Sequence, residues 1–385
     1  MAEGTGPLSG IRVVELAGIG PGPFCVMLLA DMGASVVRVD RAARPSPDYV
    51  PNPVIERGRR SIAVDLKSPE GVHVVLDLVR EADVLVESYR PGVAERLGVG
   101  PEECLAVNPR LVYGRLSAWG QDGPWAHVAG HDINYIGLTG ALHSIGRAGE
   151  RPVPPLNLVG DLGAGAASLA FGVVCALWEA RSSGLGQVVD ASVYDATTTL
   201  MGFVHGLRAQ GRWGDDRGQN LLDTGCPYYD VYTCADARWV AIGTIEERFF
   251  LTALDVLGLD PDDGLRRAHQ DRSRWPALRE ELTRRFATRT RDEWAAAFTG
   301  LDSCVTPVLD LPEAVGHEQA RARRLYLPLE GPGGVQPAVA PRFSRSITPV
   351  PAPSPLPGSD TDAVLEELGY AGEQVAALRR SGVVR

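Results

Sequence analysis

Short apolar, β-branched runs alternate with amphipathic stretches through the first part of the chain. The run "IRVVEL" (11–16) predicts a buried strand, which is followed by a glycine-rich loop (17–23) and an apolar helix (24–34). The stretch "SVVRVDR" (35–41) predicts the next strand. Together these elements form a β–α–β unit, which favours a parallel sheet with right-handed crossovers.

The same alternation continues to about residue 200. A Ser-x-x-Gly pattern within 61–71 indicates the start of a helix directly after a strand. The run 165–184 has the length and the apolar face of a core helix, and it ends at a glycine. Further strands are predicted within 61–71, 83–89, 110–120 and 187–196, and a further helix within 73–82.

The pattern changes after the stretch 212–220. A hairpin is predicted at 228–245, amphipathic helical stretches follow it, and a Pro-rich linker (348–360) leads to a short helical pair. The sequence therefore predicts an α/β protein with a second, smaller α+β domain. The expected domains are a large domain at 1–200, a linker at 201–224, a small domain at 225–319 and a C-terminal segment at 320–385.

Composition excludes several classes of function. The 385 residues carry a formal net charge of −10, which argues against binding to nucleic acid or to a membrane surface. No apolar run approaches the roughly 18 residues of a membrane span, and no signal peptide is visible. The six cysteines are far apart and form no C-x-x-C pair, which predicts reduced thiols and no zinc site. We therefore expect a cytoplasmic enzyme without a metal.

The glycine-rich loop after the first strand is similar to a dinucleotide-binding fingerprint. That fingerprint needs a third glycine where Pro23 stands, and Pro21 and Pro23 remove two N–H donors for a pyrophosphate. We therefore expect no NAD or FAD, and predict that the loop ends a core strand and lines a pocket.

A cluster of polar residues in the stretch 129–142 is the strongest candidate for chemistry. His131, Asp132, Asn134 and Tyr135 lie within five positions, among glycines and apolar residues. Burying polar groups is costly unless they are paired. Either the cluster begins a helix and is satisfied locally, or its residues serve a reaction.

Several stretches together resemble the class III CoA-transferase superfamily and, within it, the α-methylacyl-CoA racemases. The resemblance covers nearly the whole chain, and the racemase assignment rests mainly on the histidine of "GHDINY". The matching stretches are "GPLSGIRVVELAGIGPGPF", "VDLKS", "SYRPGVAERLG", "GHDINY", "RPVPPLNLVGDLGAG", "SSGLGQVVDASVYDA", "VAIGTIEERFF", "VAPRFSR" and "LPGSDTDAVLEELGY".

The resemblance implies an interlocked homodimer. Its large domain would have a Rossmann-like core, and the C-terminal segment would return to that domain. The active site would lie between the large domain of one subunit and the small domain of the other. The substrate would be an acyl-CoA thioester, so that CoA is part of the substrate and no separate cofactor is needed.

The resemblance also implies three catalytic residues: His131, Asp161 and Glu246. Inverting a carbon next to a thioester needs one acid/base group on each face of that carbon, and a donor for the enolate oxygen. His131 and Asp161 would be the two bases, and Glu246 of the partner subunit would help to set the protonation of His131. His131 and Asp132 would begin a helix at the bottom of a pocket, with the Asp132 backbone N–H as the oxyanion donor.

The CoA moiety carries phosphate charges, which an acidic protein must meet with local cations. Lys67 is the single lysine among 38 basic residues, either by compositional chance or because this position needs a point charge. By itself, Arg96 would be a solvated helix residue and the segment 56–60 an exposed loop, and the Pro-rich stretch 42–56 matches nothing specific. The residues that match CoA-binding stretches of the family are Arg41, Val64, Asp65, Leu66, Lys67, Ser88, Tyr89, Arg90, Arg96, Gly130, Asp132, Ile133, Asn134 and Tyr135.

Two alternatives remain. A CoA transferase of the same fold would use Asp161 as a nucleophile that forms a mixed anhydride. A non-catalytic acyl-CoA-binding protein would need none of the three catalytic side chains. The acyl group is left open among a branched fatty acid, a sterol side chain and an arylpropionate.

Overall fold

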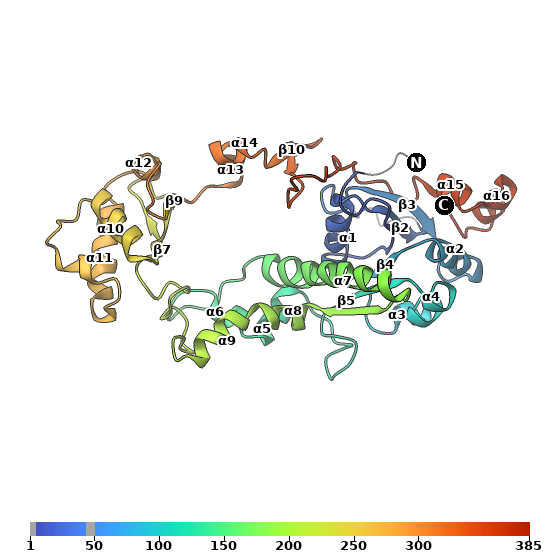
Figure 1. Cartoon of the computed structure of the whole chain (residues 1–385), viewed down its shortest axis with the longest axis horizontal. Coiled ribbons are helices and arrows are strands. Elements are labelled where there is room, and N and C mark those ends of the chain that lie inside the picture. Colours follow the sequence, from blue (N-terminus) through green and yellow to red (C-terminus); the bar gives the residue numbers. More distant parts are fainter. Residues whose placement is uncertain (1–4, 44–50) are drawn as a thin grey trace. The chain divides into compact units, whose positions relative to one another are not determined.

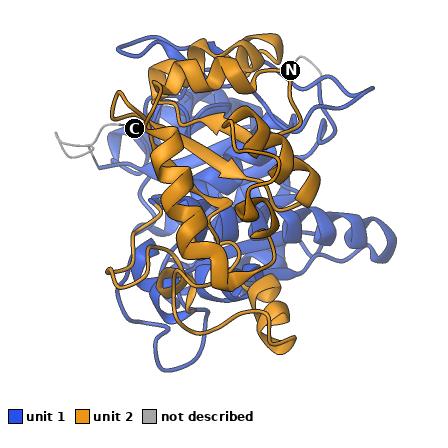
Figure 2. Cartoon of the chain, turned by 90° about the vertical axis from the view of Figure 1, so that its left-hand side faces the viewer, with its two compact units in different colours: residues 1–139, 156–200, 327–385 blue, residues 140–155, 201–326 orange. Residues whose placement is uncertain are grey.

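The computed structural model describes residues 5–43 and 51–385; residues 44–50, within the Pro-rich stretch noted above, lie outside this description. The chain divides into two compact units (Figure 2). Unit 1 comprises residues 1–139, 156–200 and 327–385, and unit 2 comprises residues 140–155 and 201–326.

A six-stranded parallel sheet forms the centre of unit 1 (Figure 1). Its order, β3-β2-β1-β4-β5-β6, reverses direction between β1 and β4. The α/β class and the parallel sheet predicted from the hydrophobic pattern are confirmed, as is the Rossmann-like core implied by the family resemblance. The strands are β1 (Arg12–Leu16), β2 (Ser35–Arg41), β3 (Arg59–Val64), β4 (Val84–Glu87), β5 (Val112–Ser117) and β6 (Val188–Ser192).

Helices cover both faces of this sheet because successive strand residues point to opposite sides. Val13 packs with the helices α1 and α7, whereas its neighbour Val14 packs with α2 and α15 on the other face. The helices of unit 1 are α1 (Pro21–Asp31), α2 (Pro69–Arg80), α3 (Val93–Arg96), α4 (Pro101–Val107), α5 (Asp132–Leu138), the π-helix η1 (Leu158–Ala166), α7 (Ala167–Ser183), α8 (Val193–Leu200), α15 (Thr361–Glu367) and α16 (Gly372–Arg380).

The start of α1 differs from the prediction. The stretch 17–23 was expected to be a loop, but the helix begins at Pro21. A proline fits the first helical position because that residue needs no N–H partner and its fixed φ is already helical. By contrast, the start of α2 is as predicted, since the Ser68 side chain accepts a hydrogen bond from the Gly71 N–H.

The segment 56–60 was expected to be an exposed loop, and this is wrong for two of its arginines. Arg57 and Arg59 are 2% and 5% exposed. Arg57 pairs with Asp31 of α1 at 2.6 Å, and Arg59 pairs with Glu15 of β1 at 2.5 Å. Buried charges persist in folded proteins when they are paired, and each of these arginines has a buried carboxylate as its partner.

The predicted core helix at 165–184 is present as α7, which ends at Gly184, but only one of its faces is buried. Leu169 and Val173 pack toward the sheet, whereas Phe171 and Trp178 are each 73% exposed. Together with η1 this is the one helical stretch of the described chain that is long and apolar enough to cross a membrane, by length and composition alone. Because it packs on β5 and β6, it belongs to the layered core of unit 1.

Unit 2 is a small α+β assembly, and its predicted hairpin is confirmed. The strand β7 (Tyr229–Thr233) pairs antiparallel with β8 (Trp239–Gly243), which pairs with β9 (Val305–Pro307). Phe250, Phe286 and Trp294 are among the residues that form its core. Its helices are α6 (Ala141–Ser144), α9 (Gly202–Ala209), α10 (Glu247–Val256), η2 (Gly264–Arg267), η3 (Arg272–Arg274), α11 (Trp275–Phe286), α12 (Arg291–Phe298), α13 (Leu311–Gly316) and α14 (Glu318–Ala322). Where the chain returns to unit 1, β10 (Tyr326–Pro328) and β11 (Val335–Pro337) form a two-stranded sheet.

Candidate active site

The carboxyl edge of the parallel sheet gathers most of the predicted CoA-binding residues. Arg41 ends β2, Val64 ends β3, and the segments 65–67 and 88–90 follow β3 and β4 directly. Because all six strands are parallel, the chain leaves each strand at the same edge of the sheet. In open α/β sheets, ligands bind at this edge where the strand order reverses, here between β1 and β4.

The loops after β1 and β4 approach each other closely at this reversal. A side chain at Gly18 would place its Cβ 2.2 Å from the Ser88 Oγ, and one at Gly22 would place it 2.7 Å from the same atom. Glycine at these two positions therefore lets the two loops meet. The glycine-rich loop is part of this edge through its packing against the predicted CoA-binding segment.

His131 occupies the N-cap position of α5, so the predicted helix start is confirmed. Its backbone N–H donates a hydrogen bond to the Asn134 Oδ1 at 3.0 Å, and its side chain is exposed. The Tyr135 hydroxyl donates to the Gly130 carbonyl, which closes the turn before the helix. Within the described residues the backbone N–H of Asp132 has no protein acceptor, as is usual in the first turn of a helix.

Asp161 lies in the first turn of the π-helix η1. In the stretch before it, Leu156 has a left-handed φ of 58°, and η1 begins at Leu158. The Asp161 N–H donates to the Asp132 Oδ1 at 2.6 Å. Burial, followed by the charge of Asp132, raises the pKa of Asp161 to about 6.

Electrostatic effects show which predicted residues are neighbours. Positive charge on His131 lowers the pKa of Asp161, so these two predicted residues lie within electrostatic range of each other. Burial raises the pKa of Tyr135 to about 12, an effect that Asp161 reinforces and Arg90 opposes. Burial also raises the pKa of Tyr89 to about 12, with Arg41 acting against it.

A sequence profile of CoA-transferase family III matches residues 8–361. The chain belongs to CoA-transferase family III. It is 43% identical over 378 residues to the α-methylacyl-CoA racemase of Mus musculus, an alignment that covers 98% of this chain and 97% of the relative. It is 41% identical over 382 residues to the α-methylacyl-CoA racemase of Homo sapiens, covering 98% of this chain and 97% of the relative. The predicted resemblance is thus confirmed.

The fold of this family III chain is also seen in solved structures. A CaiB/BaiF family protein from Brucella suis superimposes with a TM-score of 0.79 and 24% identity, over 94% of this chain and all of that chain. At this identity the likeness concerns the fold alone, and it supports the α/β architecture described above.

Three predicted site residues are exposed and make few protein contacts. Glu246 belongs to unit 2, where it is the N-cap residue of α10. Lys67 is exposed, and its backbone N–H donates to the Asp65 Oδ1 at 3.0 Å. Arg96 is exposed on α3, as expected for a solvated helix residue. The roles of these three side chains toward a substrate remain predictions.

Sequence reasoning missed two buried charged residues next to the predicted CoA-binding segment 88–90 of this family III chain. Glu87, the last residue of β4, accepts a hydrogen bond from the Tyr89 N–H at 2.6 Å, and Arg115 of β5 donates to its other oxygen at 3.2 Å. Burial raises the pKa of Glu87 to about 7. In the sequence, a buried charged residue at the end of an apolar run cannot be distinguished from an exposed residue that begins the next loop.

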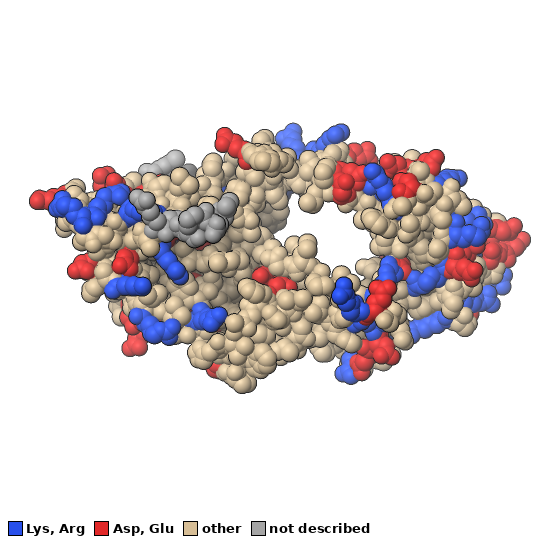
Figure 3. Space-filling model, turned by 180° about the vertical axis from the view of Figure 1, so that it is seen from behind, with Lys and Arg blue, Asp and Glu red and all other residues tan. Residues whose placement is uncertain are grey.

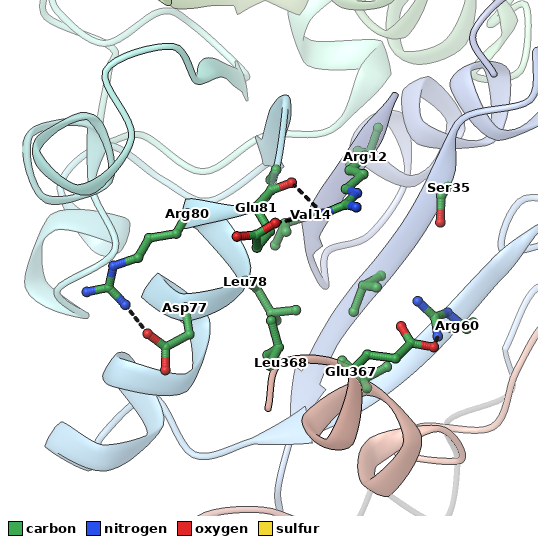
Figure 4. Close-up of a pocket in the computed structure, with 14 residues that line it drawn as sticks. Arg12, Val14, Ser35, Arg60, Asp77, Leu78, Arg80, Glu81, Glu367 and Leu368 are labelled. Atoms are coloured by element: carbon green, nitrogen blue, oxygen red, sulfur yellow. Dashed lines mark hydrogen bonds and ion pairs between the residues drawn. The ribbon is translucent and has the colours of Figure 1, made fainter. Parts of the chain in front are cut away.

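A hollow of about 730 Å³ lies at the opposite, amino edge of the sheet (Figure 4). Arg12 and Ser35, the first residues of β1 and β2, line it. Two ion pairs, Arg12 with Glu81 and Arg60 with Glu367, neutralise much of the charge of the side chains that line this hollow. Because the predicted site residues of unit 1 follow the carboxyl ends of the strands, this hollow is separate from the candidate active site.

Neither a metal site nor a broad basic surface stands out. Among residues 5–43 and 51–385, no three His, Cys, Asp or Glu side chains form a group that could hold a metal ion. On the face shown in Figure 3, basic and acidic side chains are interspersed rather than gathered by sign. The basic residues beside the candidate site are single arginines and Lys67, which suits a ligand with a few phosphate groups.

Proposed function

We propose that this chain is an α-methylacyl-CoA racemase. It would invert the 2-methyl centre of acyl-CoA thioesters by a 1,1-proton transfer between two bases. One base removes the α-proton, and the electrons of the C–H bond move into the thioester to give an enolate. The other base returns a proton to the opposite face, and the enolate electrons form the new C–H bond. CoA remains attached throughout, and no cofactor takes part.

His131 and Asp161 are the proposed bases. The observation that carries this proposal is the hydrogen bond from the Asp161 N–H to the side chain of Asp132, because Asp132 directly follows His131 and the contact brings both bases to one region. General bases work best when their pKa lies near the working pH, and the raised pKa of Asp161, about 6, brings a carboxyl close to that range. The free Asp132 N–H is suited to bind the enolate oxygen. The two racemase relatives support the same reaction.

A CoA transferase with Asp161 as nucleophile is the alternative. Such an enzyme needs the carboxylate but no second base on the opposite face. Offering the protein an acyl-CoA together with a free carboxylic acid and hydroxylamine distinguishes the two. We expect epimerisation without transfer of CoA to the acid. Transfer, with a hydroxamate formed at Asp161, would assign the transferase reaction instead.

Lys67→Ala is expected to raise KM for acyl-CoA about tenfold with little change in kcat, since a contact to a CoA phosphate is made equally in the ground and transition states. Arg80→Ala is the matched control, because Arg80 is an exposed cation at the other end of α2 and lines the amino-edge hollow. Steady-state kinetics with both variants measures the effect. An equal KM in the Lys67 variant and the unsubstituted protein would contradict a phosphate contact.

We further propose that the active protein is a homodimer in which Glu246 reaches His131 of the other subunit. The exposed apolar residues Phe171 and Trp178 of α7 support burial of this helix against a second chain. Differently tagged His131→Ala and Glu246→Ala chains can be co-expressed and purified through both tags. If Glu246 acts across the interface, the mixed dimer contains one intact site and recovers activity, although each variant alone is impaired. No recovery in a mixed dimer would contradict this arrangement.

A further inference from the structure

The side chain of Asp132 turns away from the helix that it begins. Side chains that accept from the first N–H groups of a helix usually belong to the N-cap residue, which here is His131, and Asp132 is the first residue of α5 itself. Here the Asp132 Oδ1 accepts from the Asp161 N–H at 2.6 Å, 29 residues further along the chain. The Asp132 Oδ2 is buried and has no hydrogen-bond partner in the described part of the chain, and the residue is 6% exposed.

The local backbone is built around this contact. A Cβ added at Gly160 would lie 2.5 Å from the Asp132 Oδ1 and 2.8 Å from the Ile136 Cγ2, so a side chain at this position would displace the Asp132 carboxylate from its present place. The contact falls in a π-helix, a rare conformation that is frequent at functional sites. Glycine at 160 and the widened turn of η1 together let the Asp132 carboxylate reach the backbone of Asp161.

We propose that the Asp132 side chain is a positioning residue that holds Asp161 in place and sets when its carboxyl takes up a proton. This inference rests on the proposed racemase function, and it concerns the side chain of Asp132, whereas the oxyanion role concerns its backbone. A carboxyl that removes a proton from one epimer and returns one to the other must be able to exist in both forms. The negative charge of Asp132 favours the protonated form of Asp161, and the hydrogen bond fixes the backbone that carries it.

The groups that face Asp161 act in opposite directions on its pKa. Burial and the Asp132 charge raise it, whereas a hydrogen bond from the Asn157 side chain and the charge of His131 lower it. Tyr135 of α5 also faces this carboxyl, and Arg90 acts on Tyr135. Asp132 and Asn157 therefore offer a pair of substitutions with opposite expected effects.

The test compares Asp132→Asn with Asn157→Ala. The first keeps an oxygen that can accept the Asp161 N–H but removes the charge, so the Asp161 pKa should fall. The second removes a hydrogen bond to the ionised carboxyl, so the Asp161 pKa should rise. Carbon-13 titration of the Asp161 carboxyl, assigned by its loss in Asp161→Asn, measures both shifts without relying on activity. The pH profile of kcat/KM should be measured for the epimer from which Asp161 removes the proton. The apparent pKa on its acid side should fall in Asp132→Asn and rise in Asn157→Ala.

Asp132→Ala separates the hydrogen bond from the charge. It should lower kcat beyond the Asn variant by about fivefold, the usual size of a hydrogen bond between neutral groups, with KM nearly unchanged. Rescue of kcat by the Asn variant is a result that a merely structural role would not produce.

The inference would be overturned by the following pair of results. The unsubstituted protein epimerises its substrate, and the pKa of Asp161 is the same in the Asp132→Asn variant as in the unsubstituted protein. A protein that does not epimerise would instead refute the proposed function, while the carboxyl titration would still measure the effect of Asp132. If the Asp132 variants fail to fold by circular dichroism, Asn157→Ala still gives a test. Asn157 is exposed, and an unchanged Asp161 titration in that variant would contradict the electrostatic arrangement.

Discussion

His131→Ala is expected to lose nearly all epimerisation and yet to retain α-proton exchange from one of the two epimers. Inversion needs a base on each face of the α-carbon, whereas exchange with solvent on one face needs a single base. The surviving Asp161 should still remove and return the proton on its own side. The loss of epimerisation should be on the order of 10²–10⁴-fold, the usual contribution of a positioned acid or base.

Asp161→Asn should give the converse pattern, with exchange retained from the opposite epimer and no inversion. Proton NMR in D₂O, started from each pure epimer in turn, measures exchange and inversion separately. Equal loss of exchange from both epimers in both variants would contradict independent bases, provided that thermal melts by circular dichroism show folded proteins. Full epimerisation by His131→Ala would refute the assignment of His131.

Arg59→Met is expected to destabilise the protein by about 3–5 kcal/mol, because it leaves the buried carboxylate of Glu15 without its ionic partner. The side chains of Arg59 and Glu15 are 0% and 2% exposed, and the two atoms that join them lie 2.5 Å apart. Arg59 also donates to the Pro23 carbonyl at 2.5 Å, which links β3 to the start of α1. Urea denaturation followed by circular dichroism measures the change in unfolding free energy.

Two further variants make this result specific. Arg12→Ala removes an ion pair whose side chains, Arg12 and Glu81, are 51% and 65% exposed, and should cost no more than about 1 kcal/mol. Adding Glu15→Gln to Arg59→Met removes the unpaired charge and should recover part of the lost stability. A small effect of Arg59→Met, similar to that of Arg12→Ala, would contradict a structural role for the buried pair.

The sheet and its order of elements could be predicted because a parallel, doubly covered sheet imposes a strong pattern. Strands buried on both faces must be apolar and β-branched, as in "IRVVEL" and "SVVRVDR", and helices must lie between them. The boundaries were less certain. A proline such as Pro21 is common both in loops and in the first turn of a helix. The hydrophobic pattern alone therefore could not place the start of α1.

Buried charge could not be predicted from the sequence. Arg57 and Arg59 have the composition of a solvated loop, and their partners Asp31 and Glu15 are far away along the chain. The run 165–184 was predicted to be a core helix, and the pattern gave no sign that the face of α7 with Phe171 would be exposed, because apolar periodicity does not say what covers a surface.

The candidate site was predicted in part. The helix start at His131 followed from the local pattern, and the family resemblance supplied the pairing of His131 with Asp161. The contact between the Asp132 side chain and the Asp161 backbone depends on a π-helix and on Gly160, and no simple periodicity reports a π-helix. A one-residue widening of a helical turn leaves the hydrophobic pattern almost unchanged, and so the sequence gives little warning of it.

The most direct test of the two-base account is a time course with a single epimer of a 2-methylacyl-CoA in D₂O. The account predicts that the opposite epimer forms without any added acid acceptor, and that every newly formed molecule of it carries deuterium at the α-carbon. Inversion without deuterium in the product, or stable substrate with neither inversion nor exchange, would contradict it.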